Sequence, residues 1–326
     1  MPTKTYTNPV WPNDFADPCV IRVGRDYYAY GTAPIGQDGK PFPILRSRDL
    51  VQWEPLGGAL VPLKPPAKSY WAPEVAQANG KFYLYYSASM IDSDSGHRIR
   101  VAISDVPGGP FVDMGKPLFD EFGFTIDASP FVDSKDQKPY LFFAMDFEKE
   151  DPIGTGICVI ELDPSMTRAI GAPKTVVRAT APWQIYERNR DYKGRVWPVW
   201  NCVEGPFAVA HAGKYYCLYS GGAWSKDNYG VGCVVADHPL GPWKPVTQSD
   251  EPTVLKGIPG HVIGPGHNSV VTGPDGKTLF IVYHAWDSRH DARRMHIDPL
   301  KWTDKGPQTV GPSYERRTIE IAQAGE

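Results

Sequence analysis

The chain has 326 residues, a formal net charge of −3 and 22% charged residues. This length can bury a large core, and without a basic surplus we expect neither a nucleic-acid partner nor a membrane partner. Its 33 prolines, 32 glycines and 12% aromatic residues favour many short strands joined by turns over long helices.

The start of the chain and its cysteines bear on the compartment. Residues 1–15 lack the apolar segment of a signal peptide, and no apolar run approaches the roughly 18–20 residues of a membrane span. The cysteines are odd in number, have no C-x-x-C pairing, and are Cys19, Cys158, Cys202, Cys217 and Cys233. This usage predicts free, mostly buried thiols in a reducing compartment. We therefore expect a cytoplasmic protein, or a secreted one if a leader has been removed.

Strand-like runs, each after a turn signal, recur five times along the chain. They are Tyr27–Tyr30, Phe82–Tyr86, Tyr140–Phe143, Tyr215–Tyr219 and Leu279–His284. Each lies in a longer segment of similar pattern, and these segments begin at Ala16, Ala72, Asp127, Glu204 and Gly266. The segments are 55, 57, 76 and 62 residues apart, measured between Pro18, Pro73, Pro130, Pro206 and Asn268. A nearly fixed spacing with one longer interval indicates a repeat architecture.

A second repeated element lies between these segments. It reads ILRSRDLVQW from Ile44, VAISDVPGGPF from Val101 and VVADHPLGPW from Val234, each a strand, a polar turn and an apolar residue that can pack between units. Two such hairpins make a four-stranded blade, and closing the blades into a ring removes exposed sheet edges. We therefore predict an all-β fold, a five-bladed β-propeller that occupies residues 1–326 as a single catalytic domain. Thr180–Val199 is predicted to be an insertion between the third and fourth blades.

Acidic residues recur near the start of the repeated segments. In a propeller the first strand of each blade lines the central channel, and these positions carry Asp17, Glu74, Asp127, Glu204 and His267. Any one acid could be a turn cap or an exposed charge, and a histidine alone is often structural. A ring of carboxylates around one axis is costly, because like charges in a partly dry site raise one another's pKa values. Glycosidic cleavage explains the ring, since it needs one carboxyl protonated and another ionised.

Seven motifs, in order and spanning Asn8 to about Trp302, resemble glycoside hydrolase family 43. They are NPVWPNDFADP, RSRDLVQWEPLG, YWAPEV, IDASPFVD, EGPF followed by GKYYCLYSGG, GPGHNSVV and RRMHIDPLKW. The resemblance implies an inverting mechanism with Asp17 as general base and Glu204 as general acid. Asp127 would keep Glu204 protonated and aligned. The family also places an arginine against the terminal sugar, which the spacing assigns to Arg293 before Arg294, although a surface salt bridge explains either.

The resemblance suggests further contacts with the sugar. Trp71 is a candidate for sugar stacking, with core packing as the competing explanation, and Glu74 is interpreted as a hydrogen-bonding residue of the pocket. Some family members hold calcium in the channel near a histidine that His267 matches, so His267 is a candidate for the sugar pocket and for a metal. Calcium would be structural and largely water-coordinated, and no cofactor is expected for the chemistry.

The expected substrates are xylo- or arabino-oligosaccharides. The family includes β-D-xylosidases, α-L-arabinofuranosidases, enzymes with both activities and endo-arabinanases. We expect exo release of terminal xylose or arabinofuranose, with the insertion at Trp183–Trp200 as a wall and no accessory C-terminal β-sandwich. An endo-α-1,5-L-arabinanase is one alternative. A non-catalytic sugar-binding propeller is another, but it would not need Asp17, Asp127 and Glu204 together. A retaining enzyme acting on fructans would begin differently from WPNDFADP. The oligomeric state is not predicted.

Overall fold

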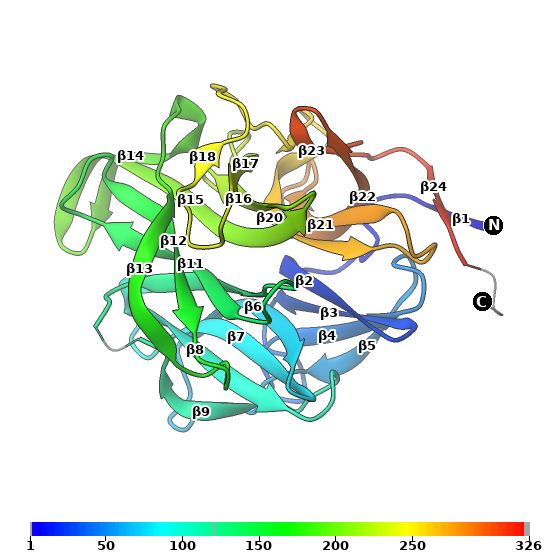
Figure 1. Ribbon diagram of the computed structural model, residues 1–326, viewed down its shortest axis with the longest axis horizontal. Helices are drawn as coiled ribbons and strands as arrows, with labels where there is room; N and C mark the ends of the chain where they lie inside the picture. The colour runs from blue at the N-terminus through cyan, green and yellow to red at the C-terminus, as the bar shows by residue number, and fades with distance from the viewer. Residues whose placement is uncertain (1, 120, 323–326) are drawn as a thin grey trace.

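Antiparallel sheets follow one another around a central axis in the computed structural model, which describes residues 2–119 and 121–322 (Figure 1). The first blade contains β2 (Ala16–Val23), β3 (Asp26–Thr32), β4 (Pro43–Ser47) and β5 (Trp53–Gly58). The second contains β6 (Ser69–Ala78), β7 (Lys81–Ser89), β8 (His97–Ser104) and β9 (Val112–Pro117), with the short 3₁₀ turn η1 (Asp94–Gly96) between β7 and β8. The third contains β10 (Thr125–Val132), β11 (Pro139–Phe147), β12 (Gly154–Leu162) and β13 (Ala169–Val177).

The fourth blade contains β15 (Arg195–His211), β16 (Lys214–Gly221), β17 (Gly230–Ala236), β18 (Lys244–Pro245) and β19 (Leu255–Lys256). The fifth contains β20 (Ile263–Thr272), β21 (Leu279–Trp286), β22 (Arg294–Thr303) and β23 (Gly306–Thr309). The first strands β2, β6, β10, β15 and β20 contact one another in that order, and β20 contacts β2 to close the ring. The predicted five-bladed propeller is confirmed, and each strand run predicted from the sequence lies in the second strand of a blade. Within the described residues no helix has the length and apolarity of a membrane span.

The hydrophobic core is divided among the spaces between neighbouring blades. Tyr30 of the first blade, for example, packs edge-on against Phe111, which follows the turn after β8 of the second blade. Leu50 and Trp243, which follow the equivalent turns elsewhere, pack in the same way between other pairs of blades. Burying one such side chain contributes about 1.5–3 kcal/mol, so these contacts hold adjacent blades in fixed register.

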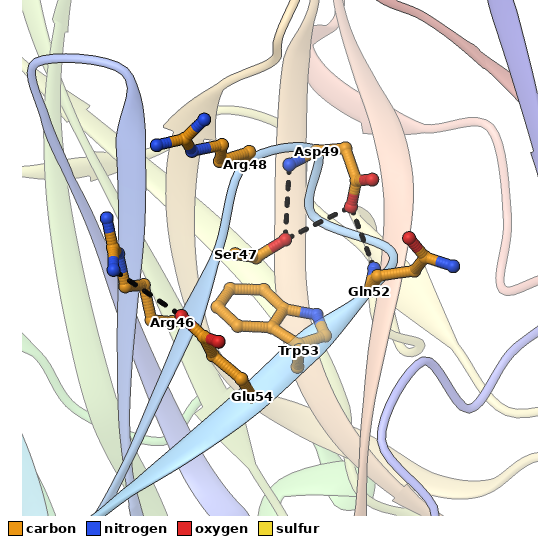
Figure 2. Close-up of a pocket in the computed structure, with 7 residues that line it drawn as sticks. All are labelled: Arg46, Ser47, Arg48, Asp49, Gln52, Trp53 and Glu54. Carbon is orange, nitrogen blue, oxygen red and sulfur yellow. Dashed lines mark hydrogen bonds and ion pairs between the residues drawn. The ribbon is translucent and has the colours of Figure 1, made fainter.

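The turn between β4 and β5 shows why the RSRDLVQW motif is structural. Asp49 Oδ1 accepts hydrogen bonds from the backbone N–H of Gln52 and from the Ser47 hydroxyl (Figure 2). It also accepts one from the backbone N–H of Val51. The side chain thus closes the turn. We assign no function to the shallow hollow beside it.

Each first strand contains a β-bulge at the same level of the channel. The pairing register shifts there, and one residue takes a left-handed φ of 48–56°: Asp17, Ala72, Asp127, Gly205 and His267. A bulge re-aims the side chain next to it, which explains how polar groups reach the axis.

The bulges correct the alignment expected from the sequence. Asp17, Asp127 and His267 are equivalent, but Glu204 precedes its bulge residue and Glu74 follows its own by two positions. The prediction that all five side chains occupy equivalent positions is therefore wrong for Glu204 and Glu74. The error arose because acids at different distances from their proline were grouped together: Asp17 directly precedes Pro18, whereas Glu204 lies two residues before Pro206 and Glu74 directly follows Pro73.

The two ends of the described chain meet beside the first and fifth blades. There β1 (Thr3–Tyr6) pairs with β24 (Arg317–Glu320) (Figure 1). The segment after β1 continues along the fifth blade, where Phe15 N donates to Arg293 O at 2.7 Å. This pairing brings the strand that carries Asp17 against the segment that carries Arg293.

The predicted insertion between the third and fourth blades is confirmed. It contains the short 3₁₀ turn η2 (Pro182–Gln184), β14 (Ile185–Tyr192) and the first half of β15, which pairs with β14 as a hairpin. Tyr192, Trp197 and Trp200 form a small core within the hairpin. Because β15 runs on into the fourth blade, the hairpin is a rigid extension of the strand that carries Glu204.

Candidate active site

A cavity of about 290 Å³ lies at the mouth of the channel and contains all three predicted catalytic acids. Its lining residues are Asp17, Thr32, Trp71, Ile126, Asp127, Glu204, Trp224, His267 and Arg293. Asp17 and Asp127 are only 7% and 5% exposed. Carboxyl groups are seldom buried in this way unless they are paired or have a function, so their environments decide what the cavity can do.

The Asp17 carboxyl group lies among the side-chain nitrogen atoms of one arginine and two histidines. Its Oδ1 is 3.2 Å from Arg293 Nη1 and 3.4 Å from His267 Nδ1, and its backbone N–H donates to His284 Nδ1 at 3.1 Å. Burial alone would raise the pKa of Asp17, but Arg293, His267 and His284 hold it well below its usual range. The carboxylate is therefore ionised and able to accept a proton from water.

Polar side chains from the preceding blades bind the N–H groups of the bulges. The pairs are Thr32 Oγ1 with Ala72 N at 2.8 Å, Ser87 Oγ with Asp127 N at 3.2 Å, Ser220 Oγ with His267 N at 2.7 Å, and His284 with Asp17 as above. Each acceptor lies at the same point of the second strand of its blade, opposite the residue before the bulge. This ring of hydrogen bonds fixes the backbone from which the site residues project.

The third blade breaks this pattern. Ala144 occupies the position of the missing hydroxyl, opposite Ile126. The Gly205 N–H, which would be its partner, instead donates to Asp127 Oδ2 at 3.0 Å. The Asp127 carboxyl is thereby held beside Glu204, the residue just before Gly205.

Asp127 retains its proton more strongly than an ordinary aspartic acid. Burial raises the pKa of Asp127 to about 7, His267 opposes this rise, and the negative charges of Glu204 and Asp17 add to it. Like charges in one site disfavour the simultaneous ionisation of both groups. Asp127 is therefore expected to keep its proton at a pH where Asp17 is ionised.

Glu204 is oriented by two uncharged donors that the sequence did not indicate. The Tyr229 hydroxyl donates to Glu204 Oε1 at 2.8 Å, and the Cys202 thiol donates to Oε2 at 3.2 Å. Neither donor carries a charge. These two hydrogen bonds fix the position of the Glu204 carboxyl group in the cavity.

His267 lies between the two aspartates, with Nδ1 4.0 Å from Asp127 Oδ2. Burial alone would lower the pKa of His267, but Asp17, Asp127, Glu204 and Glu74 raise it. An imidazolium has no lone pair for a metal, and calcium takes about six to eight oxygen ligands. Residues 2–119 and 121–322 contain no cluster of three or more His, Cys, Asp or Glu suited to hold an ion. The donor set therefore fits a directly bound calcium poorly. The calcium that the sequence analysis placed at His267 stays a prediction.

The structure separates the two candidate arginines. Arg293 lines the cavity and also lies over the Trp224 ring, 4.6 Å from its centroid. Arg294 turns away and pairs with Asp287 at 3.0 Å and Asp291 at 2.8 Å. Of the two, Arg293 can reach a bound sugar.

Trp71 and Glu74, both in β6, lie in different surroundings. Trp71 lines the cavity, and one of its ring faces stacks on His97 at 3.5 Å. Its other face could support a sugar ring. Glu74 is buried beside Cys19, which shares a hydrogen bond with it, and is not among the residues that line the cavity. We therefore assign Glu74 no contact with the sugar.

Several site residues escaped the sequence analysis. Thr32 and His284 occupy the place in their blades that Ser87 and Ser220 occupy in theirs, opposite the residue before the bulge. The strand register shows this equivalence, whereas the ends of the aromatic runs do not. Tyr229 lies outside the repeated segments and carries no comparable signal.

The chain is similar to proteins of known activity. The model of the family described as Glycosyl hydrolases family 43 matches residues 6–307. The β-D-galactofuranosidase xynD of Aspergillus niger is 28% identical over 92% of this chain and 83% of its own length. An extracellular exo-α-(1→5)-L-arabinofuranosidase of Streptomyces avermitilis is 25% identical over 95% of this chain, which spans 64% of that relative. The crystal structure of a thermostable family-43 glycoside hydrolase superposes with a TM-score of 0.82 at 34% identity, covering 95% of this chain and 97% of the other.

Proposed function

The chain belongs to glycosyl hydrolases family 43, and on that premise we propose that it is an exo-acting, inverting enzyme for pentose-containing oligosaccharides. It would release terminal β-D-xylose, α-L-arabinofuranose or both from hemicellulose-derived chains. The observation that carries the proposal is the contrast within one cavity between Asp17, held ionised by Arg293, and Asp127, which keeps its proton and lies beside Glu204.

In this mechanism each carboxyl group has one task. Asp17 takes a proton from water as the water oxygen attacks the anomeric carbon. The glycosidic C–O bond breaks, and Glu204 gives its proton to the leaving oxygen. Attack from the face opposite the leaving group inverts the configuration. Asp127 holds Glu204 in place by accepting a hydrogen bond from the Gly205 N–H.

The size and lining of the cavity support action on a single terminal sugar. About 290 Å³ lies at the small end of ligand pockets, and the walls include Trp71, Trp224 and Arg293. The hairpin of β14 and β15 reaches Glu204 and hence the leaving-group side. It therefore supports recognition of the leaving group more than it supports closure around the terminal sugar.

The test uses p-nitrophenyl β-D-xylopyranoside, α-L-arabinofuranoside and β-D-galactofuranoside, the last because of the activity named for the Aspergillus relative. The purified protein should release p-nitrophenol from at least one pentoside, and proton NMR should show the inverted anomer as first product. Glu204→Gln should lower kcat on the matching disaccharide by roughly 100-fold or more, whereas Glu320→Gln, an exposed control, should not.

Other outcomes point elsewhere. Release from the galactofuranoside alone would replace the pentose assignment and keep the mechanism. Cleavage of debranched arabinan within the chain, without release from any aryl glycoside, would favour an endo-arabinanase. Retention of configuration would overturn the inverting mechanism.

A further inference from the structure

A second hollow adjoins the sugar cavity on the far side of Glu204. It shares Glu204 and Trp224 with that cavity, and its other lining residues include Asp94, Asp146, Tyr186 and Arg190. A general acid must face the oxygen that it protonates, and that oxygen joins the terminal sugar to the leaving group. The leaving group therefore extends from the cavity of Asp17 past Glu204 into this hollow.

Arg190 is the one cation among the residues that line the hollow. Its side chain is 17% exposed, and its guanidinium lies over the rings of Tyr186, Tyr192 and Trp200 at 4.7, 4.2 and 4.9 Å. The nearest acid, Glu187, is 4.0 Å away, beyond hydrogen-bond distance. Within residues 2–119 and 121–322, Arg190 donates no hydrogen bond to the protein. Packing against these rings therefore fixes the direction of the guanidinium N–H groups, and these groups are available to a ligand in the hollow.

The hairpin that carries Arg190 is fixed before any ligand arrives. Asp146 of β11 accepts hydrogen bonds from Thr155 at 3.1 Å, from the Tyr192 hydroxyl at 3.0 Å and from Lys193 Nζ at 3.0 Å. These bonds tie the end of β14 and the following turn to the third blade. A guanidinium on a fixed element loses little freedom when it binds, so each hydrogen bond it forms contributes more to affinity.

The charge balance of the hollow indicates what the guanidinium meets. Asp146 is neutralised by Lys193, and the exposed Asp94 adds a negative charge at the hollow that offsets Arg190. An acidic ligand would gain from Arg190 but would be repelled by Asp94 and by any ionised form of Glu204. A neutral ring with hydroxyl groups can accept from Arg190, donate to Asp94 and pack against Tyr186 without such repulsion.

We propose that Arg190 is a specificity-determining residue that binds the hydroxyl groups of a neutral glycosyl unit on the leaving-group side of the cleaved bond. This inference rests on the proposed function and deepens it, since it gives the enzyme a preference for oligosaccharides over glycosides that lack a second sugar. The bond cleaved and the roles of the acids are unchanged.

The experiment compares two substrates of the released pentose: its disaccharide and its glycosyl fluoride, whose leaving group is too small to reach Arg190. Arg190→Met removes the donors and keeps much of the volume, Arg190→Lys keeps the charge without the fork, and Arg188→Met is a matched change on the exposed part of the same strand. For Arg190→Met we expect kcat/KM on the disaccharide to fall roughly 10- to 100-fold, mainly through KM, with the fluoride changed by less than about twofold. Arg190→Lys should lie between, and Arg188→Met should match the wild type.

An equal fall on both substrates would overturn the proposal, because Arg190 would then act through the fold or through Glu204. No fall on either substrate would also overturn it. A disaccharide with a uronosyl leaving unit should react more slowly than the neutral one. A faster reaction that Arg190→Met abolishes would reassign the hollow to acidic sugars. Failure of the wild type to hydrolyse the fluoride would instead count against the proposed function itself.

Discussion

Replacing Glu74 by Gln is expected to stabilise the protein, and to do so increasingly as the pH rises. Burial raises the pKa of Glu74 from 4.5 to about 8. The hydrogen bond with Cys19 and the charge of His267 lower this pKa, whereas the charge of Asp127 raises it further. The unfolded chain therefore releases the Glu74 proton near pH 4.5, whereas the folded protein retains it to about pH 8. The contribution of Glu74 to stability is fully present below pH 4.5 and is lost as the pH rises through 8.

The size of the effect follows from the width of this window. Within it, the stability difference between Glu74→Gln and the wild type should grow by roughly 1.4 kcal/mol per pH unit, reaching about 3–5 kcal/mol in all. The amide has nearly the volume of the carboxylic acid and carries no charge at any pH, so the variant keeps the packing and removes the titration.

Urea unfolding of both proteins at intervals from pH 4.5 to 8.5 would measure this difference. Glu320→Gln on the exposed strand β24 is the control, and its difference from the wild type should stay flat across the same range. Parallel stability curves for Glu74→Gln and the wild type would refute the reasoning, since they would mean that the Glu74 carboxyl titrates alike in both states.

Three further predictions concern the active site. Ala144→Ser should supply a hydroxyl that competes with Asp127 for the Gly205 N–H. Because losing that hydrogen bond raises the pKa of Asp127, the pH–rate profile should move to higher pH. An unchanged profile would contradict this. Arg293→Met should lower kcat/KM by roughly 100-fold and shift the acidic limb of the pH–rate profile to higher pH, because Arg293 helps hold the pKa of Asp17 down. An acidic limb at the same pH would show that the other neighbours of Asp17 are enough to keep its pKa low. Dialysis against EDTA should leave activity and Tm unchanged, because His267 already pairs with the aspartates; a loss that calcium restores would show a bound ion.

The repeat could be predicted from the sequence because its signals are local. Aromatic runs such as Tyr83–Tyr86 follow turn residues closely, and this order survives in every blade. The bulges could not be predicted, because they depend on hydrogen bonds between blades. Pro130 resembles Pro18 in the sequence, yet the bulge in its strand falls at Asp127, where the N–H binds Ser87 of the preceding blade.

The ring of hydrogen bonds to the bulges also shows why the role of Asp127 cannot be read from sequence patterns. The informative residue is Ala144, a small apolar side chain that attracts no functional hypothesis. Ala144 has no side-chain acceptor for the Gly205 N–H, so this N–H donates to Asp127 Oδ2. Motif resemblance can say that Asp127 is the third acid, but the reason it lies beside Glu204 requires the strand register of two blades.

The different tasks that we propose for Asp17 and Glu204 follow from an asymmetry across the cavity. On one side Asp17 faces the guanidinium of Arg293 and the ring of His267, which favour its charged form. On the other side Glu204 accepts hydrogen bonds from two neutral donors, the Tyr229 hydroxyl and the Cys202 thiol, and has Asp127 as its acidic neighbour. Two carboxyl groups in one cavity can therefore act as base and acid at the same pH, because the groups bonded to them differ. Removing Arg293 from the Asp17 side would reduce that difference while leaving every carboxyl group in place.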